Sequence, residues 1–204
     1  MKPSTKGLTA PKTHFSTSTL AIVEIEPYKL IRISTHNTNE PFFNNSGKSR
    51  FDDPNPVIAA RYKTCYFGFK LATALAETLL HDRKPVRQHF AIQPEVIDKS
   101  FVLHYQGTTL TLANMTGVPL KRAGLHAGLS GASYYKTPQR WSSAIYNHPA
   151  YVDGFIYMSR HLNTEKAVVL FDRAMSKIQM NTATPLPNYP GFARAAKLLG
   201  IKAA

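Results

Sequence analysis

The sequence predicts an α+β fold, because short runs of strand-forming residues outnumber helical segments and do not alternate with them regularly. No internal repeat is visible along the 204 residues. The 43% hydrophobic content is normal for a folded globule, and a chain of this length buries roughly 70% of its unfolded surface. We therefore expect one domain with a hydrophobic core.

The first element expected to be ordered is a pair of short strands. Residues 1–18 are rich in Ser, Thr, Pro and Lys and lack periodicity, which predicts a flexible basic tail. Runs of Ile, Leu and Val over 20–26 and 29–34 predict strands, and Pro27 predicts a break between them. Arg32 lies between two isoleucines, so its side chain should point to the opposite face of the strand.

The next elements form a loop, a strand and a helix. A segment rich in Asn, Ser and Gly predicts a polar loop that ends at Arg50. Aromatic residues over 62–67 predict a strand, and the Ala- and Leu-rich segment over 71–82 predicts a helix. Its leucines recur every four residues and predict a core stripe. Glu77 lies off that stripe, so the pattern alone favours a solvated side chain.

The second half of the chain predicts further strands and two helices. We expect a hairpin with strands over 101–105 and 108–113, a loop over 123–136, and strands over 154–158 and 167–171. A helix should run from Thr137, as N-cap, to about Asn147, with Pro138 in its first turn. After Asp172 no strand signal is visible. An extended linker over 185–190 and a short basic helix over 191–199 are expected there.

The charge of the chain is strongly and unevenly positive. It holds 25 Lys and Arg residues against 12 Asp and Glu residues, for a net charge of +13. Residues 99–152 and 173–204 contain no acid at all. Such a field attracts polyanions, anionic cofactors or an acidic protein, although a solvated basic surface explains it equally well. No RRM, KH, zinc-finger or helix-turn-helix signature accompanies the charge, so direct nucleic-acid binding is not expected.

Cellular location is constrained by what the sequence lacks. A single cysteine, Cys65, excludes an intramolecular disulfide and fits a reducing compartment. Its aromatic neighbours predict a small buried core residue rather than a reactive thiol. No signal peptide and no apolar run of about 18 residues are present, so a cytoplasmic protein without a membrane span is expected.

Several families of site are excluded by the absence of their motifs. The eight histidines include no HExxH and no pair at helical i, i+4 spacing, and Cys65 has no partner, so no metal site is expected. No GxGxxG or GxxxxGK[ST] motif is present, which excludes those nucleotide-binding loops. No Gly-x-Ser-x-Gly elbow is present, and the spacing of Ser159 supports no catalytic triad.

Four polar residues on different elements remain as candidates. They are Arg50, Tyr66, Glu77 and Ser159, and their surroundings form a recognisable pattern. The pattern comprises Gly47-x-x-Arg50-Phe51, Tyr66-Phe67-Gly68, Ala74 to Asp82, Trp141 to Pro149, Asp153 to Arg160, and Leu170 to Ala174. In this order, and with eleven residues from Tyr66 to Glu77, it resembles the RES domain family, named for its Arg, Glu and Ser. The resemblance spans about residues 29–174.

The resemblance implies a toxin of an Xre–RES toxin–antitoxin pair with an ADP-ribosyltransferase-like fold, a mixed or antiparallel sheet flanked by helices. It also implies a RES domain over 19–174, a basic extension over 175–204, and NAD as the substrate with no prosthetic group. Matched position by position, Glu77 and Arg50 are the catalytic candidates, and Arg32, Tyr66 and Ser159 are the NAD-binding candidates. The loop after Arg50 is longer than in compact members, so Arg61 remains an alternative for the family arginine. An Xre-type antitoxin, with an acidic surface that blocks the site, is the implied partner.

The residue types suit cleavage of NAD. Breaking the nicotinamide–ribose bond passes through an oxocarbenium-like state, which a carboxylate such as Glu77 can stabilise while it orients the attacking group. Arg50 can hold a diphosphate with two parallel hydrogen bonds. The Tyr66 ring can stack on a base, and Ser159 can bond to a ribose hydroxyl or to the carboxamide.

Three functions therefore stay open at this point. The first is hydrolysis or phosphorolysis of NAD. The second is transfer of ADP-ribose to a protein acceptor, which would attach a label from NAD to a macromolecule. The third is a basic binding module without catalytic activity, which would bind nucleic acid with a steep salt dependence.

Overall fold

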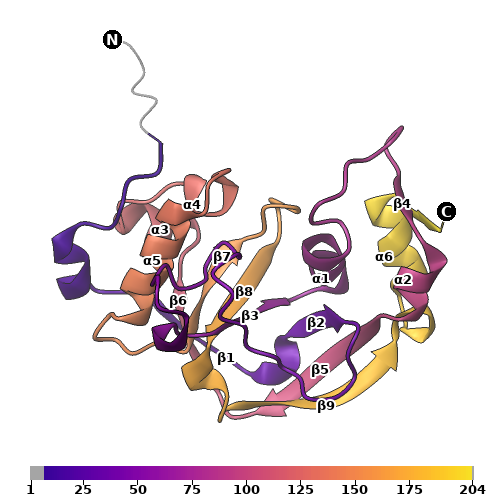
Figure 1. Cartoon of the computed structure of the whole chain (residues 1–204), viewed down its shortest axis with the longest axis horizontal. Coiled ribbons are helices and arrows are strands. Elements are labelled where there is room, and N and C mark those ends of the chain that lie inside the picture. Colours follow the sequence, from indigo (N-terminus) through magenta and orange to yellow (C-terminus); the bar gives the residue numbers. More distant parts are fainter. Residues whose placement is uncertain (1–6, 204) are drawn as a thin grey trace.

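The computed structural model describes residues 7–203, which form an eight-stranded sheet flanked by two groups of helices (Figure 1). In sheet order the strands are β1 (Ile22–Ile25), β6 (Leu110–Asn114), β7 (Gly154–Met158), β8 (Lys166–Phe171), β3 (Thr64–Gly68), β2 (Ile31–Ser34), β5 (Phe101–Gly107) and β9 (Ile178–Pro185). All neighbours are antiparallel except β6 and β7, which are parallel. This mixed sheet confirms the predicted α+β class. Within 7–203, no helix combines the length and apolar character needed to cross a membrane.

The sheet is split in its middle. Strands β2 and β3 share one residue pair, Ile31 with Gly68, and then diverge. On their outer sides both strands are fully paired, β2 with β5 and β3 with β8. The backbone carbonyl of Tyr66 faces the split and accepts a hydrogen bond from the side chain of Arg32 at 3.1 Å. The guanidinium of Arg32 thus donates the hydrogen bond that a backbone amide of β2 would donate if β2 and β3 were paired along their whole length.

Helices cover the two halves of the sheet separately. In Figure 1, α3 (Gly117–Arg122), α4 (Gly128–Gly131) and α5 (Lys136–Tyr146) lie on one side, and α1 (Leu71–Thr78), α2 (Pro94–Asp98) and α6 (Phe192–Leu199) lie on the other. A small parallel pair, β4 (Phe90–Ile92) with β10 (Ile201–Ala203), lies beside α6. Leu75 on the predicted leucine stripe of α1 is fully buried in this second group.

Buried side chains from β3, β5, β6, β7 and β8 form a hydrophobic core of their own. Cys65 belongs to it and is 1% exposed, and burial raises the pKa of its thiol to about 11. The prediction of a structural core cysteine is therefore confirmed.

Several predicted strands are found close to their expected bounds, but the hairpin over 101–113 is wrong. Strand β5 pairs with β2 and β9, whereas β6 pairs with β1 and β7. Gly107 has φ of +142°, and the amide of Thr108 donates to the carbonyl of Lys177. Local sequence marks the turn correctly, but it cannot show that the curled sheet gives each strand a different partner.

The region after Asp172 also differs from expectation. A 3-10 turn over Asp172–Ala174 leads into β9, which lies at the edge of the main sheet. The predicted extension over 175–204 thus contributes a strand to that sheet. Most β9 side chains are exposed or half-buried, so the strand lacks the hydrophobic alternation that reveals a buried strand. The predicted linker contains a 3-10 turn, Leu186–Asn188, and the predicted helix α6 follows it.

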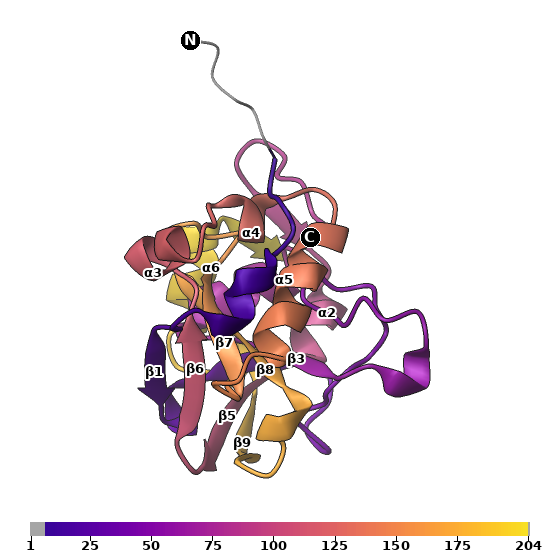
Figure 2. The same cartoon turned by 90° about the vertical axis from the view of Figure 1, so that its left-hand side faces the viewer.

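The amino-terminal segment packs on the fold where the structure describes it. A 3-10 turn, Thr13–Thr17, lies beside α5 (Figure 2). Its Phe15 is buried against Trp141 of α5, with ring centroids 5.0 Å apart. The indole of Trp141 donates to the carbonyl of Thr9 at 2.7 Å. Residues 7–18 therefore depart from the predicted flexible tail, and residues 1–6 of that tail lie outside the described residues.

Two shorter corrections concern the bounds of helices. Helix α5 begins at Lys136, with Tyr135 in the N-cap position and no side-chain cap, so Thr137 is not the N-cap. Helix α1 ends at Thr78, whereas the sequence predicted that it would continue to Asp82. Further 3-10 turns, Pro27–Lys29 and Ile58–Ala60, lie in the connections before β2 and β3.

Candidate active site

A pocket of about 380 Å³ opens at the split between β2 and β3. Its walls come from both strands, from α1, and from loops that lie far apart in the sequence. The side chains that line it and carry polar or aromatic groups are Arg32, Lys48, Ser49, Arg50, Phe51, Tyr66, Phe67, Glu77, Thr78, His81, Asp82, Tyr135, Tyr157, Arg160 and His161. Four of the five predicted site residues thus line one pocket, and the fifth, Ser159, contacts it through Glu77.

Glu77 is held in place by Ser159. The serine hydroxyl donates to Oε1 of Glu77 at 2.5 Å, and its oxygen accepts the backbone amides of His161 and Leu162 at 3.2 and 3.0 Å. Ser159 is 1% exposed and does not line the pocket. Its hydroxyl is therefore engaged by Glu77 in this structure, whereas the sequence predicted that Ser159 would contact substrate. Glu77 itself is half-buried and faces the pocket rather than bulk solvent.

Arg50 is a buried cation without an acidic partner among residues 7–203. It is 8% exposed, and Nη1 donates to the carbonyl of Ala132 at 2.7 Å. Its guanidinium lies 4.6 Å from the ring centroid of Tyr135, while the buried Nη2 has no hydrogen-bond acceptor among the described residues. Burial lowers the pKa of Arg50, although an arginine remains charged at neutral pH. Arg50 also lines the pocket, and a guanidinium there without an acidic partner among the described residues is suited to bind an anion.

Arg61, the alternative family arginine, lies outside this pocket. It donates to the carbonyls of Asn55, Asn45 and Ser46, and thereby braces the loop that carries Arg50. Gly47 of the same loop has φ of +76°, and a side chain there would collide with the Arg61 guanidinium. The structure therefore places Arg50 in the pocket and gives Arg61 a supporting role.

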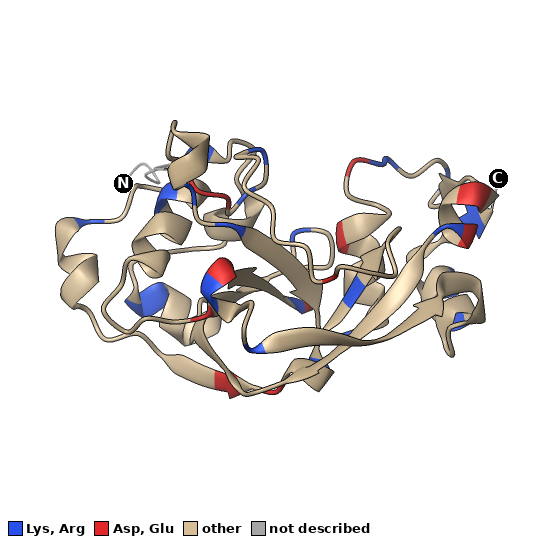
Figure 3. Ribbon diagram, turned by 60° about the horizontal axis from the view of Figure 1, so that its bottom comes forward, with Lys and Arg blue, Asp and Glu red and all other residues tan. Residues whose placement is uncertain are grey.

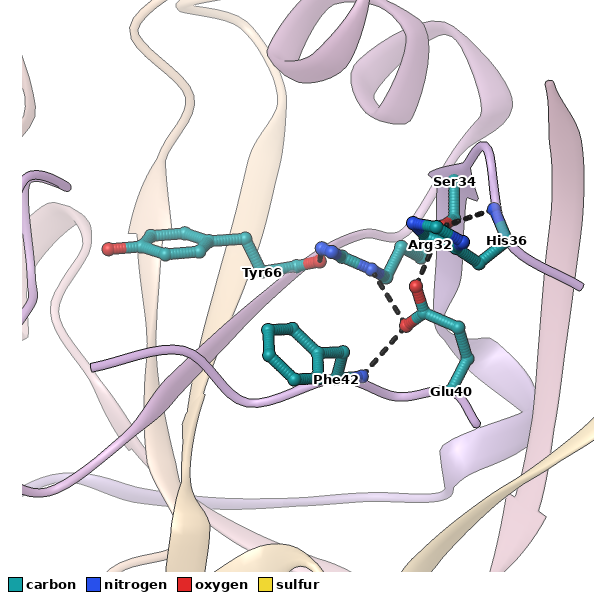
Figure 4. Close-up of polar contacts among 6 residues, drawn as sticks. All are labelled: Arg32, Ser34, His36, Glu40, Phe42 and Tyr66. Atoms are coloured by element: carbon teal, nitrogen blue, oxygen red, sulfur yellow. Dashed lines mark hydrogen bonds and ion pairs between the residues drawn. The ribbon is translucent and has the colours of Figure 1, made fainter. Parts of the chain in front are cut away.

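Arg32 is oriented by a buried carboxylate. Its Nε lies 3.2 Å from Oε2 of Glu40, whose side chain is 2% exposed (Figure 4). Glu40 also accepts from the hydroxyl of Ser34 at 2.6 Å and from the amide of Phe42 at 2.8 Å. Arg32 lines the pocket, and its Nε and Nη1 both donate hydrogen bonds within the protein. Its Nη2 has no hydrogen bond to the described residues and is therefore available to a ligand. As predicted, the side chain leaves the strand on the face opposite the buried Ile33.

Tyr66 lines the pocket, and its hydroxyl is hydrogen-bonded to the protein backbone. The amide of Phe51 donates to that hydroxyl at 3.0 Å, and the two rings stack with centroids 6.3 Å apart. Burial raises the pKa of Tyr66 and of Tyr157 well above 10, so neither hydroxyl acts as a base near neutral pH. The Tyr66 ring, rather than its hydroxyl, is therefore the group available to a ligand.

The pocket lining carries more positive than negative charge. It contains four basic residues, Arg32, Lys48, Arg50 and Arg160, and two acidic residues, Glu77 and Asp82. Elsewhere on the ribbon, Lys and Arg also outnumber Asp and Glu (Figure 3). An anion that also carries a group reactive toward a carboxylate would match this arrangement.

Sequence reasoning missed two pocket residues, His81 and His161. Their ring nitrogens, Nδ1 and Nε2 respectively, lie 3.1 Å apart, and both are close to the Glu77 carboxylate. Burial lowers the pKa of His161 and outweighs the nearby Glu77, which raises it, so a neutral imidazole is favoured. The i, i+4 spacing of Glu77 and His81 in the predicted helix over 71–82 was the available signal, although α1 ends at Thr78 and His81 lies in the turn after it.

The whole pocket falls within a segment that matches a known family. A family model described as "RES domain" matches residues 29–189 of this chain. The matched span contains all five predicted site residues and also β9, so it extends beyond the segment recognised in the sequence.

Individual relatives are more distant. "Probable toxin y4kH" of Sinorhizobium fredii is 32% identical over 80 residues, which are 39% of this chain and 62% of that protein. The chain therefore spans less than two thirds of that relative's length. One chain of the crystal structure of the M. tuberculosis MbcT–MbcA toxin–antitoxin complex aligns at 9% identity with a TM-score of 0.59, covering 93% of this chain and 99% of that one. At this identity the likeness shows that the two chains share a fold.

Proposed function

Because this chain belongs to the RES domain family, we propose that it is an enzyme that cleaves the nicotinamide–ribose bond of NAD. One observation carries this proposal. Glu77, fixed by Ser159, shares a pocket with Arg50, a buried guanidinium without an acidic partner among the described residues. A dinucleotide offers both an anion for the arginine and a sugar carbon that becomes positively charged as its bond breaks.

In the proposed complex, the two arginines bind the diphosphate. Arg50 lines the pocket through its guanidinium-bearing side chain, and Arg32 has an unbonded Nη2, so each side chain can contribute donors to a phosphate. The aromatic rings of Tyr66 and Tyr135 line the same pocket and can pack against a base. The anion would also give Arg50 the charge partner that it lacks among the described residues, which supplies part of the affinity.

Glu77 is the proposed catalytic residue. As the C–N bond breaks, its electron pair leaves with nicotinamide, which departs as a neutral base, so no strong general acid is needed. The ribose becomes oxocarbenium-like, and the Glu77 carboxylate stabilises this charge and orients the attacking group. With water the products are ADP-ribose, nicotinamide and a proton. With inorganic phosphate, a phosphorylated ADP-ribose forms instead.

A biological role as the toxin of a toxin–antitoxin pair is the second part of the proposal. It is supported by the family and by relatives that are named as a probable toxin and as a toxin–antitoxin complex. Depletion of NAD would account for toxicity. The net charge of +13 favours an acidic partner surface, consistent with an antitoxin of Xre type that covers the pocket.

The test is nicotinamide release from NAD by purified protein, compared between wild type, Glu77→Gln and Glu24→Gln. Glu24 is exposed on β1, so its variant controls for loss of a glutamate elsewhere. We expect release by wild type and Glu24→Gln, and a loss of about 10²–10³-fold in Glu77→Gln. Equal release by Glu77→Gln would refute the assigned role.

The acceptor is identified in the same assay. Dependence of the rate on added phosphate indicates phosphorolysis, and a rate without phosphate indicates hydrolysis. Label from NAD that becomes attached to protein would instead support transfer of ADP-ribose. Arrest of cell growth on expression of wild type, but not of Glu77→Gln, tests the toxin role.

A further inference from the structure

Two histidines that the proposed reaction does not use lie beside Glu77 at the edge of the pocket. Nε2 of His161 is 3.1 Å from Nδ1 of His81. The ring centroids are 4.9 Å apart with the planes inclined by 55°, so the rings meet through their nitrogens rather than stack. One oxygen of Glu77 and one nitrogen from each histidine all lie within 4.8 Å of one another.

We propose that Glu77, His81 and His161 form a site for Zn²⁺ or a chemically similar divalent cation. Zn²⁺ binds imidazole nitrogen and carboxylate oxygen at about 2.0–2.2 Å, which places tetrahedral ligand atoms roughly 3.3 Å apart. The two histidine nitrogens already have nearly this separation. The Glu77 oxygen would have to move to reach the ion, and the three ligand atoms already lie within 4.8 Å of one another.

The second carboxylate oxygen of Glu77 is available for this purpose. Oε1 accepts the hydrogen bond from Ser159, whereas Oε2 has no hydrogen bond to the described residues. The fourth coordination position can face the pocket, since all three ligands line it. The site would therefore be open on the side where the substrate is proposed to bind.

His81 also has a supporting acid of the kind found around metal ligands. Its Nε2, the nitrogen that points away from His161, lies 3.6 Å from Oδ1 of Asp82. Metal-binding histidines usually donate their second N–H to a carboxylate or carbonyl, which fixes the ring and its tautomer. Asp82 is exposed and outside hydrogen-bond distance, so a small rotation would complete this contact.

The chemistry of the ligands selects among cations. Two imidazoles favour Zn²⁺ and its transition-metal neighbours over Mg²⁺ and Ca²⁺, which prefer oxygen. The basic lining of the pocket, including Arg50 and Arg160, opposes any cation. A simple hydrogen bond between His81 and His161 is the competing explanation for their contact, and it requires no metal affinity.

The bound ion would inhibit the enzyme, and this consequence rests on the proposed function. Coordination places a positive charge on the Glu77 carboxylate, which can then no longer stabilise an oxocarbenium-like ribose. Zn²⁺ would thus act as a reversible inhibitor whose removal by a chelator restores activity.

Binding is tested without reference to activity. The full chain is titrated with Zn²⁺ by calorimetry, and with Co²⁺ by visible absorption, which reports tetrahedral coordination. The variants are His81→Ala, His161→Ala and, as a matched control, His14→Ala, which removes an exposed histidine on the amino-terminal 3-10 turn. Circular dichroism shows that each variant is folded, and Mg²⁺ serves as the control cation.

We expect one Zn²⁺ per chain, an intense Co²⁺ band, and affinity reduced at least about tenfold in His81→Ala and His161→Ala but not in His14→Ala. Equal affinity of all four proteins, or the absence of a Co²⁺ band from wild type, would overturn the site. Nicotinamide release is then measured with Zn²⁺ and with chelator. Active protein that binds Zn²⁺ at this site but is not inhibited would overturn the inhibitory role. Inactivity of metal-free wild type counts against the proposed function, while the site is still decided by the binding data.

Discussion

The hydroxyl of Ser159 and the carboxylate of Glu77, 82 positions apart in the sequence, are joined by a hydrogen bond of 2.5 Å. Ser159 directly follows β7 and Glu77 lies on α1, so this bond connects the two halves of the split sheet at the pocket. Two of the three residue types that name the family are therefore in direct contact, which is the basis for the proposal that the serine orients the glutamate.

Replacing Ser159 with alanine should lower kcat for NAD cleavage by about 10- to 100-fold with little change in KM, because a hydrogen bond to a charged group contributes about 1.5–3 kcal/mol. Ser159→Thr keeps the hydroxyl and should retain more activity. Exposed Ser176 provides the control variant Ser176→Ala. A rise in KM alone would indicate that Ser159 contacts substrate instead.

Replacing Arg50 with lysine should raise KM for NAD by about tenfold or more, since lysine cannot offer two parallel donors to a diphosphate. Steady-state kinetics as a function of NAD concentration measure this effect. Arg122→Lys on α3, outside the pocket lining, is the matched control and should leave KM unchanged. An unchanged KM in Arg50→Lys would remove Arg50 from the binding site.

Replacing Glu40 with glutamine should reduce the free energy of unfolding by about 1–3 kcal/mol, because its buried carboxylate serves three donors, among them Arg32. Urea denaturation measures the change. The exposed Glu24→Gln should differ from wild type by less than about 0.5 kcal/mol. If Glu40→Gln also lowered the free energy of unfolding by less than about 0.5 kcal/mol, the ion pair of Glu40 with Arg32 would contribute little to stability.

Stability should fall in mild acid because of His104. Burial lowers the pKa of its imidazole below the ordinary 6.5, and Nε2 lies 2.8 Å from the hydroxyl of Tyr189. Between the two pKa values the unfolded chain binds more protons, so the free energy of unfolding decreases as pH falls below about 6.5. Urea denaturation between about pH 8 and about pH 5 should show a shallower decrease in His104→Gln. If the free energy of unfolding changed equally with pH in wild type and in His104→Gln, His104 would not be the source of the pH dependence.

The sequence predicted those parts of the fold and site that local pattern carries. Strands such as β7 and β8 are apolar runs with clear bounds, and Arg50 and Glu77 could be matched by order and spacing. The partner of each strand was not predictable for β5 and β6, because a turn signal does not specify pairing across a curled sheet. Strand β9 escaped notice because an edge strand with exposed side chains has no hydrophobic alternation.

The contacts that complete the site were also beyond local pattern. His161 follows Ser159 in a polar loop, and nothing near it in sequence indicates that it meets His81, 80 positions away. Likewise, Ser159 could be assigned to the site but not to its role, because only the fold shows that its hydroxyl is engaged by Glu77. Residue identity thus indicated the candidate groups, and the tertiary structure shows what each one contacts.

Replacing Phe15 with alanine tests whether residues 7–18 are an integral part of the fold. Phe15 is 4% exposed and packs edge-on against Trp141 and His148. Removing a buried phenylalanine costs about 3–5 kcal/mol through lost burial and the cavity left behind. We expect a decrease of about this size in urea denaturation, whereas the neighbouring exposed Thr13→Ala should change stability by less than about 0.5 kcal/mol.

The same variant separates stability from catalysis. Phe15 does not line the pocket, so KM for NAD should be unchanged in the folded fraction of Phe15→Ala. A loss of less than about 1 kcal/mol would mean that the segment does not dock on α5 in solution. A normal loss of stability accompanied by a large rise in KM would instead show that the amino-terminal segment shapes the pocket through Trp141 and the loop beyond it.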